Sequence, residues 1–242
     1  MTPAVFAVIF AVTLIGACVQ ASIGFGLGML VAPVVVLIAP DLVPATIIML
    51  GAVVTLVVTA HEGRHIDLRG TGWALAGRFP GTLAGTALVV LLPASGLSLV
   101  LAGTVVFGVV LAIRGWRPAP HRRNLVVAGL ASGVLGTATS IGGPPMSLVF
   151  HGLSGARLRS TMSGFLLVGS VVSVLSLAAA GAVGRDSVLA CLTLTPAIVL
   201  GYLASRYVNR FMTPLRLRYA AIAVSLLGAA ALIIREIAQF VL

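Results

Sequence analysis

The chain has little charge and, in particular, little negative charge. Of 242 residues, 8% are charged and only five are acidic, whereas arginine accounts for all fifteen basic residues because lysine is absent. Hydrophobic residues make up 60% of the sequence, and the mean hydropathy is +1.18. Soluble domains carry about 25% charged residues. The composition therefore excludes an ordinary soluble domain and indicates an integral membrane protein.

Several chemical functions lack the residues that they need. Cys18 and Cys191, the two cysteines, both lie inside apolar stretches, which argues against a disulfide framework and against a zinc site. No phosphate-binding Gly-x-x-x-x-Gly-Lys-Ser/Thr run is present, so no ATPase activity of the chain itself is expected. No acidic residue lies in the middle of an apolar stretch, which argues against an intramembrane enzyme. We expect no enzyme activity, no cofactor and no metal.

The polar loop 61–67 contains His61, Glu62, His65 and Asp67. A metal site or a proton relay would use such residues, because histidine titrates near neutral pH. The sequence contains no second group of such residues that would complete a metal site, so a solvated loop is the favoured interpretation. Proton coupling through these residues stays open.

Eight apolar segments organise the chain. Six are long enough to cross a hydrocarbon core of about 30 Å, which takes roughly 20 residues. These six lie at 42–60, 70–92, 95–113, 160–182, 186–206 and 216–236. Two longer segments, 3–39 and 124–152, are interrupted by glycine and proline near their middle, so each predicts a broken, re-entrant helical hairpin.

Two pairs of segments repeat at nearly one offset, which indicates an internal duplication. Residues 21–28 and 139–145 share Ser-Ile-Gly at a spacing of 118, and residues 80–85 and 196–201 match at a spacing of 116. We therefore predict an N-terminal repeat (1–113), an inter-repeat loop (114–123) and a C-terminal repeat (124–242). Each repeat would contain one hairpin followed by three transmembrane helices.

The arginines predict the orientation. They gather in the inter-repeat loop and in the loop before the last helix, at Arg114, Arg117, Arg122, Arg123, Arg206, Arg210, Arg216 and Arg218. Arginine-rich loops stay in the cytoplasm, so these arginines predict a cytoplasmic loop rather than a surface for nucleic acid. The first hairpin then starts and ends outside, and the second starts and ends inside. The expected fold is an all-α integral membrane protein with two inverted repeats and both termini outside.

The Gly24-Phe25-Gly26-x-Gly28 run followed by Pro33, together with the later Gly-Gly-Pro-Pro at 142–145, resembles the sulfite exporter TauE/SafE family of bacterial transporters. The resemblance covers the whole chain in length, helix count and duplication. It implies a multi-pass protein of the bacterial inner membrane that transports small anions, notably sulfite, sulfonates and other organosulfur anions.

The broken helices themselves predict where an anion binds. A break leaves backbone N–H groups without partners, and a helix N-terminus carries about half a positive charge. Inverted repeats bring equivalent breaks together near the bilayer midplane. Tight helix packing by small residues is the alternative explanation for the glycines, and the duplication favours a binding site. The candidate substrate-binding residues are Gln20, Ser22, Gly24, Phe25, Gly26, Gly28, Arg78, Thr139, Ser140, Gly142, Gly143, Pro144 and Pro145.

Two of these candidates have an open role. Arg78 lies well inside an apolar stretch, where it either contacts or gates the substrate or anchors its helix at the interface. Gln20 either caps the first break or touches the substrate, because a buried amide needs partners.

The favoured function is secondary transport of a small anion, with the lipid bilayer as the surrounding partner and no nucleic acid. A non-catalytic subunit of a larger membrane complex is the alternative. A homodimer, the identity of the anion, the direction of transport and the coupling ion are left open by the sequence.

Overall fold

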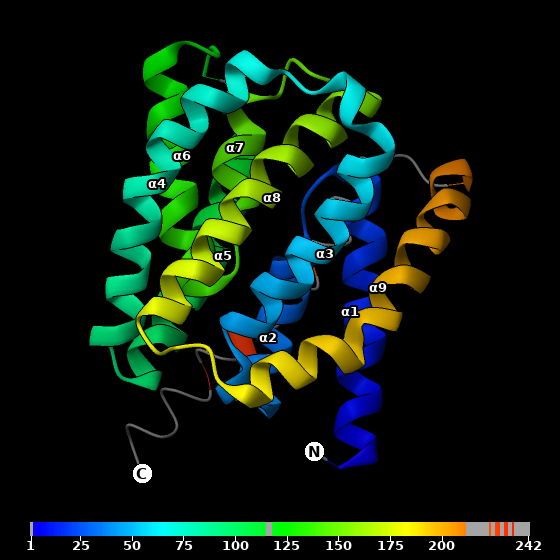
Figure 1. Ribbon diagram of the computed structural model, residues 1–242, viewed down its shortest axis with the longest axis vertical. Coiled ribbons are helices and arrows are strands. Elements are labelled where there is room, and N and C mark those ends of the chain that lie inside the picture. The colour runs from blue at the N-terminus through cyan, green and yellow to red at the C-terminus, as the bar shows by residue number, and fades with distance from the viewer. Residues whose placement is uncertain are drawn as a thin grey trace.

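The computed structural model describes residues 2–114 and 118–211, and a few separate residues between 223 and 234. The described residues contain nine α-helices, two short 3-10 helices and no strand, which confirms the all-α class (Figure 1). The α-helices are α1 (Pro3–Ile23), α2 (Leu27–Ile38), α3 (Ala45–Glu62), α4 (Leu68–Leu91), α5 (Ala94–Arg114), α6 (Arg122–Thr139), α7 (Gly143–Val149), α8 (Gly155–Ala179) and α9 (Arg185–Phe211). The 3-10 helices are η1 (Pro40–Leu42) and η2 (Gly63–His65).

Among the described residues, five helices are long and apolar enough to cross a membrane, namely α1, α3, α4, α8 and α9. The chain is therefore a multi-pass membrane protein. In contrast, α2 has 12 residues and α7 has seven. At 1.5 Å per residue neither can span a core of about 30 Å. The helix expected at 216–236 lies outside the described residues apart from a few single positions.

Local sequence explains where the long helices begin and end. α1 starts at Pro3, and the Thr2 hydroxyl accepts a hydrogen bond from the Val5 N–H. It ends at Gly24, whose left-handed backbone (φ 91°) suits glycine and whose N–H donates to the Gln20 carbonyl. α4 starts after Asp67, whose carboxylate accepts from the Gly70 N–H at 3.1 Å.

The helices pack in pairs. α4 lies along α6, α1 lies along α9, and α3 packs against α8 between them. Glycines make the first two contacts close: β-carbons at Gly77 and Gly81 would overlap backbone carbonyls of α6, and one at Gly201 would overlap the Leu14 carbonyl of α1. Small residues at helix contacts let two backbones approach each other in a membrane.

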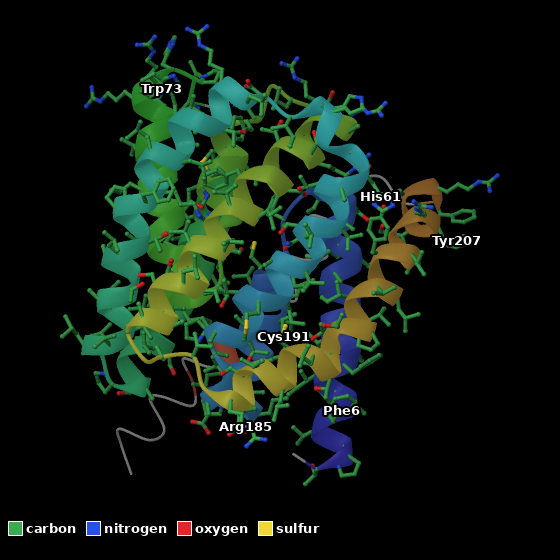
Figure 2. The ribbon with its side chains drawn as sticks, viewed as in Figure 1. Phe6, His61, Trp73, Arg185, Cys191 and Tyr207 are labelled. Atoms are coloured by element: carbon green, nitrogen blue, oxygen red, sulfur yellow. The ribbon has the colours of Figure 1, made fainter. Side chains whose placement is uncertain are left out.

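The two ends of the helix bundle differ. Figure 1 shows α4, α6 and α8 starting at the top, whereas α1 and α9 start at the bottom. In Figure 2, Trp73 marks the top end and Arg185 the bottom end. Large apolar side chains such as Leu83, Leu175 and Leu192 are exposed along the sides, as expected of a surface that faces lipid.

Candidate functional site

The two helix breaks lie against each other in the interior. The first joins α1 to α2, with a positive φ at Gly24 and at Gly26 (129°). The second joins α6 to α7, and there the non-glycine residue Ser140 takes the left-handed conformation (φ 65°). A β-carbon at Gly28 would overlap the Ser140 carbonyl oxygen, and one at Gly143 would lie 2.7 Å from the Phe25 β-carbon. The chain therefore brings its two breaks into direct contact.

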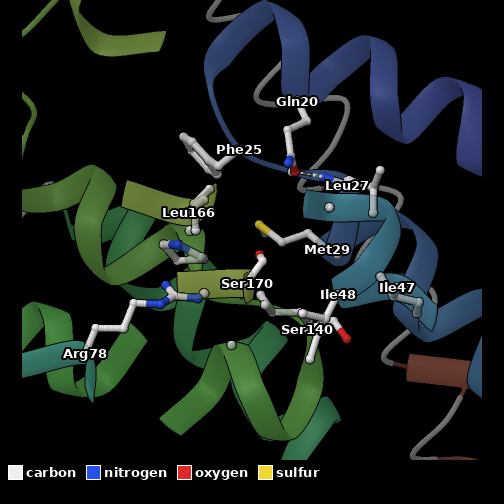
Figure 3. A pocket seen from close by; sticks show the side chains of 18 residues that line it. Gln20, Phe25, Leu27, Met29, Ile47, Ile48, Arg78, Ser140, Leu166 and Ser170 are labelled. Carbon is white, nitrogen blue, oxygen red and sulfur yellow. Dashed lines mark hydrogen bonds between the residues drawn. The ribbon is translucent and has the colours of Figure 1, made fainter. Parts of the chain in front are cut away.

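A cavity of about 40 Å³ lies between the breaks (Figure 3). Nine of the candidate residues line it: Gln20, Phe25, Gly26, Gly28, Arg78, Ser140, Gly142, Gly143 and Pro144. A volume of roughly 10–15 Å³ holds one water molecule, so this cavity has room for a few waters or a small ion.

The other four candidates, Ser22, Gly24, Thr139 and Pro145, are absent from the cavity wall. The Ser22 hydroxyl donates to the Cys18 carbonyl at 2.7 Å, and the Thr139 hydroxyl donates to the Leu135 carbonyl at 2.6 Å. Ser140 lines the cavity, but its hydroxyl donates to the Pro44 carbonyl at 3.1 Å. The hydroxyls of these three candidate residues thus donate to the protein backbone in this structure.

Gln20 caps the first break. Its side-chain oxygen accepts a hydrogen bond from the Leu27 N–H at 3.0 Å, at the first residue of α2. Both residues also line the cavity, and Figure 3 shows the amide beside Phe25 and Leu27. The two roles considered for Gln20, capping the turn and facing a ligand, are therefore compatible in one position.

Arg78 is buried in the protein interior, with 3% of its surface exposed. Its Nη1 donates to the Ser132 hydroxyl at 2.7 Å, and that hydroxyl donates to the Gly142 carbonyl in the second break. The guanidinium carbon lies 4.8 Å from the centre of the Phe165 ring. Such a position does not fit an anchor at the membrane interface, because the charged group points into the bundle.

The buried guanidinium has no carboxylate partner in the part of the chain that the structure describes. Among the described residues the ion pair is between Arg159 and Glu62, at 2.8 Å, and Arg78 is not part of it. The Nε of Arg78 is buried without a hydrogen-bond acceptor. A buried charge without a partner is costly, so the site holds a positive charge that an anion would neutralise.

Three glycines make room for this side chain. A β-carbon at Gly169 of α8 would overlap the Nε of Arg78. Those at Gly136 and Gly142 would lie 3.3 and 3.2 Å from the two terminal guanidinium nitrogens. The space around the guanidinium is thus built from α6, α8 and the second break together.

Some backbone positions at the two breaks have no free N–H group. α7 begins Gly143-Pro144-Pro145, and proline has no N–H. At the start of α2, the Leu27 N–H already donates to Gln20. The full positive charge in the cavity therefore comes from Arg78, with the α2 N-terminus adding only a partial charge.

Several residues at the site were not anticipated from the sequence. Ser132, Phe165 and Gly169 hold Arg78, and the cavity wall also includes Met29, Ile47, Ile48, Leu166 and Ser170. Ser132 and Ser170 could have been found from the sequence, since each is a polar residue inside a largely apolar helix.

The polar loop between α3 and α4 has structural roles. The Glu62 carboxylate accepts from Nε and Nη2 of Arg159 at 3.1 and 2.8 Å, and Asp67 caps α4. Within the described ranges, no three histidine, cysteine, aspartate or glutamate residues are grouped to hold a metal ion.

Comparison with known proteins gives one family. A family model described as "Sulfite exporter TauE/SafE" matches residues 8–232 of the chain. No curated protein and no solved structure matches the chain.

Proposed function

The chain belongs to the sulfite exporter TauE/SafE family of membrane transporters, and on that premise we propose that it is a secondary transporter of sulfite, a sulfonate or a related organosulfur anion. Members of this family are transporters and not enzymes, so the intramembrane-enzyme alternative is set aside. We assign the chain to the inner membrane of a bacterium.

The buried guanidinium of Arg78, which lines the cavity and has no carboxylate partner among the described residues, carries the proposal. An oxyanion in the cavity would accept charge-assisted hydrogen bonds from it, which are about twice as strong as neutral ones. Ser132 fixes one terminal nitrogen, so the guanidinium is held in place before the anion arrives. Such preorganisation lowers the entropic cost of binding.

The rest of the wall favours a small ligand. Met29, Ile47 and Leu166 present apolar surface to the cavity, and they leave about 40 Å³ between the breaks. An anion with a compact head would place its oxygens against Arg78 and the α2 N-terminus. A bulky organic group would need the two breaks to move apart.

Two inverted repeats are part of the proposal, and the helix ends support them. α1 and α6 end at Ile23 and Thr139, 116 residues apart, and the same offset joins the N-cap residues Gly26 and Gly142. The internal prolines of α4 and α9, at 80 and 196, follow it as well. The spacing of 118 between the Ser-Ile-Gly runs is therefore out of register by two residues.

Helix packing supports the same symmetry. Exchange of the two repeats would turn α1 into α6 and α4 into α9, so the α1–α9 contact would become the α6–α4 contact, and both are extensive. Rocking of one repeat against the other around a central site is the usual way to expose that site alternately to the two sides. We propose that the anion is carried in this way.

Export is the proposed direction. A membrane potential that is negative inside favours anion efflux by about 2.3 kcal/mol per charge per 100 mV. Outward movement therefore needs no coupling ion, whereas uptake would need one.

Liposomes that contain the purified chain test the proposal. Loaded with sulfite, sulfoacetate, thiosulfate or acetate in separate batches, they should release at least one sulfur anion, and Arg78→Gln should stop that release. Arg185→Gln, which changes an exposed arginine at the start of α9 away from the cavity, should leave the release unchanged. Release that is equal in the Arg78→Gln variant would exclude the proposed site, and no release of any anion would favour the alternative of a subunit that needs other chains.

A further inference from the structure

We propose that a second anion site lies at the end of the bundle where α4 and α6 begin, and that it binds the phosphate of an anionic phospholipid. The site is a cavity of about 330 Å³, separate from the cavity between the helix breaks. Its volume falls in the range of known small-molecule sites, roughly 300–1,000 Å³.

Two arginines from different helices line this cavity. Arg69 belongs to the first turn of α4, and Arg122 is the first residue of α6. Neither forms an ion pair with a carboxylate of the described chain, where Arg159 pairs with Glu62. Two arginines in the wall of one cavity suit a phosphate, which accepts bidentate hydrogen bonds from arginine.

The wall of the cavity holds one of the two guanidinium groups in place. Arg122 stacks over the Trp73 ring, with its guanidinium carbon 4.7 Å from the ring centre. Phe150, the C-cap of α7, also lines the cavity and lies close to Gly70. The carboxylate of Asp67 belongs to the wall as well, but it accepts the Gly70 N–H as the cap of α4, so its charge is partly compensated by the helix N-terminus.

The neighbouring surface indicates that the phosphate comes from a lipid. Leu68 is 78% exposed and Trp73 is 37% exposed, and both belong to α4, which is long enough to span the membrane. Tryptophan collects at the level of the lipid headgroups, and Figure 2 shows Trp73 at the end of the bundle. Basic cavities between helices at this depth bind anionic headgroups. A soluble phosphate has no acyl chains to contact the apolar surface beside the arginines.

Native mass spectrometry of the purified chain tests the assignment, with phosphatidylglycerol as the probe and phosphatidylcholine as the zwitterionic reference. Phosphatidylglycerol should be retained in preference to phosphatidylcholine. The double variant Arg69→Gln/Arg122→Gln should retain about 25-fold less of it, since each arginine near an anionic surface contributes a factor of about five. Trp73→Leu, which removes the stacked ring, should give a smaller loss.

Arg64→Gln is the matched control, because Arg64 is also exposed between α3 and α4 but is absent from the cavity wall. It should leave lipid retention unchanged. If Arg64→Gln lost as much phosphatidylglycerol as the double variant, the retention would depend on general surface charge, and the proposal would be overturned. Displacement of the lipid by millimolar glycerol phosphate would also overturn it, because the site would then recognise a soluble phosphate. Neither result bears on anion transport through the central cavity.

Discussion

Gly28, the second residue of α2, touches Ser140 in the second helix break, and the contact leaves no space for a side chain. A β-carbon at Gly28 would overlap the carbonyl oxygen of Ser140. Ser140 is itself held in a left-handed conformation and bound through its hydroxyl to the Pro44 carbonyl, so it cannot easily move away. The cavity between the breaks depends on this contact.

Gly28→Ala should therefore separate the two breaks. Inserting one methyl group into a tightly packed interior costs about 1–3 kcal/mol, so we expect a lower melting temperature in detergent and a strong loss of anion release. Gly72→Ala is the control, because no atom of the described chain lies within 4 Å of a β-carbon at Gly72 in α4. Equal melting temperatures and equal release for both variants would contradict the close contact.

Gly169→Ala should act through Arg78. The added β-carbon would occupy the place of the Arg78 Nε, so the guanidinium would have to leave its position over Phe165. Gly169→Ala and Arg78→Gln should each reduce anion release, and the double variant should be little worse than either one, because groups that act as a unit are not additive. Fully additive losses would mean that Gly169 acts independently of the arginine.

Gln20 allows its two roles to be separated. Gln20→Leu removes the acceptor of the Leu27 N–H and should destabilise the chain by about 1–3 kcal/mol. Gln20→Glu keeps an acceptor but places a carboxylate on the cavity wall, so it should keep more of the stability and still lose anion binding. Thermal unfolding and anion release, measured on both variants, distinguish the two effects. Normal release by Gln20→Glu would place the anion away from this wall.

The positive-inside rule predicts the orientation of the bundle, and single cysteines test this prediction. Arg123→Cys lies at the start of α6 and Arg185→Cys at the start of α9, and both positions are exposed. In intact cells a membrane-impermeant thiol reagent should label Arg185→Cys and should label Arg123→Cys only after permeabilisation. The natural Cys18 and Cys191 are buried, so background labelling should be low. The reverse pattern would invert the assignment of inside and outside.

The sequence predicted the breaks because glycine and proline act locally. A left-handed turn at Gly24 and a helix start at Pro144 and Pro145 follow from the conformational limits of those residues. The depth of Arg78 was also visible in the sequence, since an arginine within an apolar stretch must find a polar environment.

The partners of Arg78 were not predictable in the same way. Ser132, Phe165 and Gly169 come from α6 and α8, 54 or more residues away along the chain. No local pattern specifies that these helices meet α4 at this level. Likewise, Ser22 and Thr139 are candidate binding residues in the sequence. In a helix, however, their hydroxyls donate to the carbonyl four residues before them.

A crystal structure of the chain with selenite, whose shape resembles that of sulfite and whose selenium scatters X-rays anomalously, tests the central claim most directly. The account predicts an anomalous peak in the cavity between the breaks, within hydrogen-bonding distance of the Arg78 guanidinium, and no such peak for Arg78→Gln crystals soaked in the same way. A peak found only among the arginines at the ends of the bundle, or a cavity that stays empty while liposomes release the anion, would contradict it.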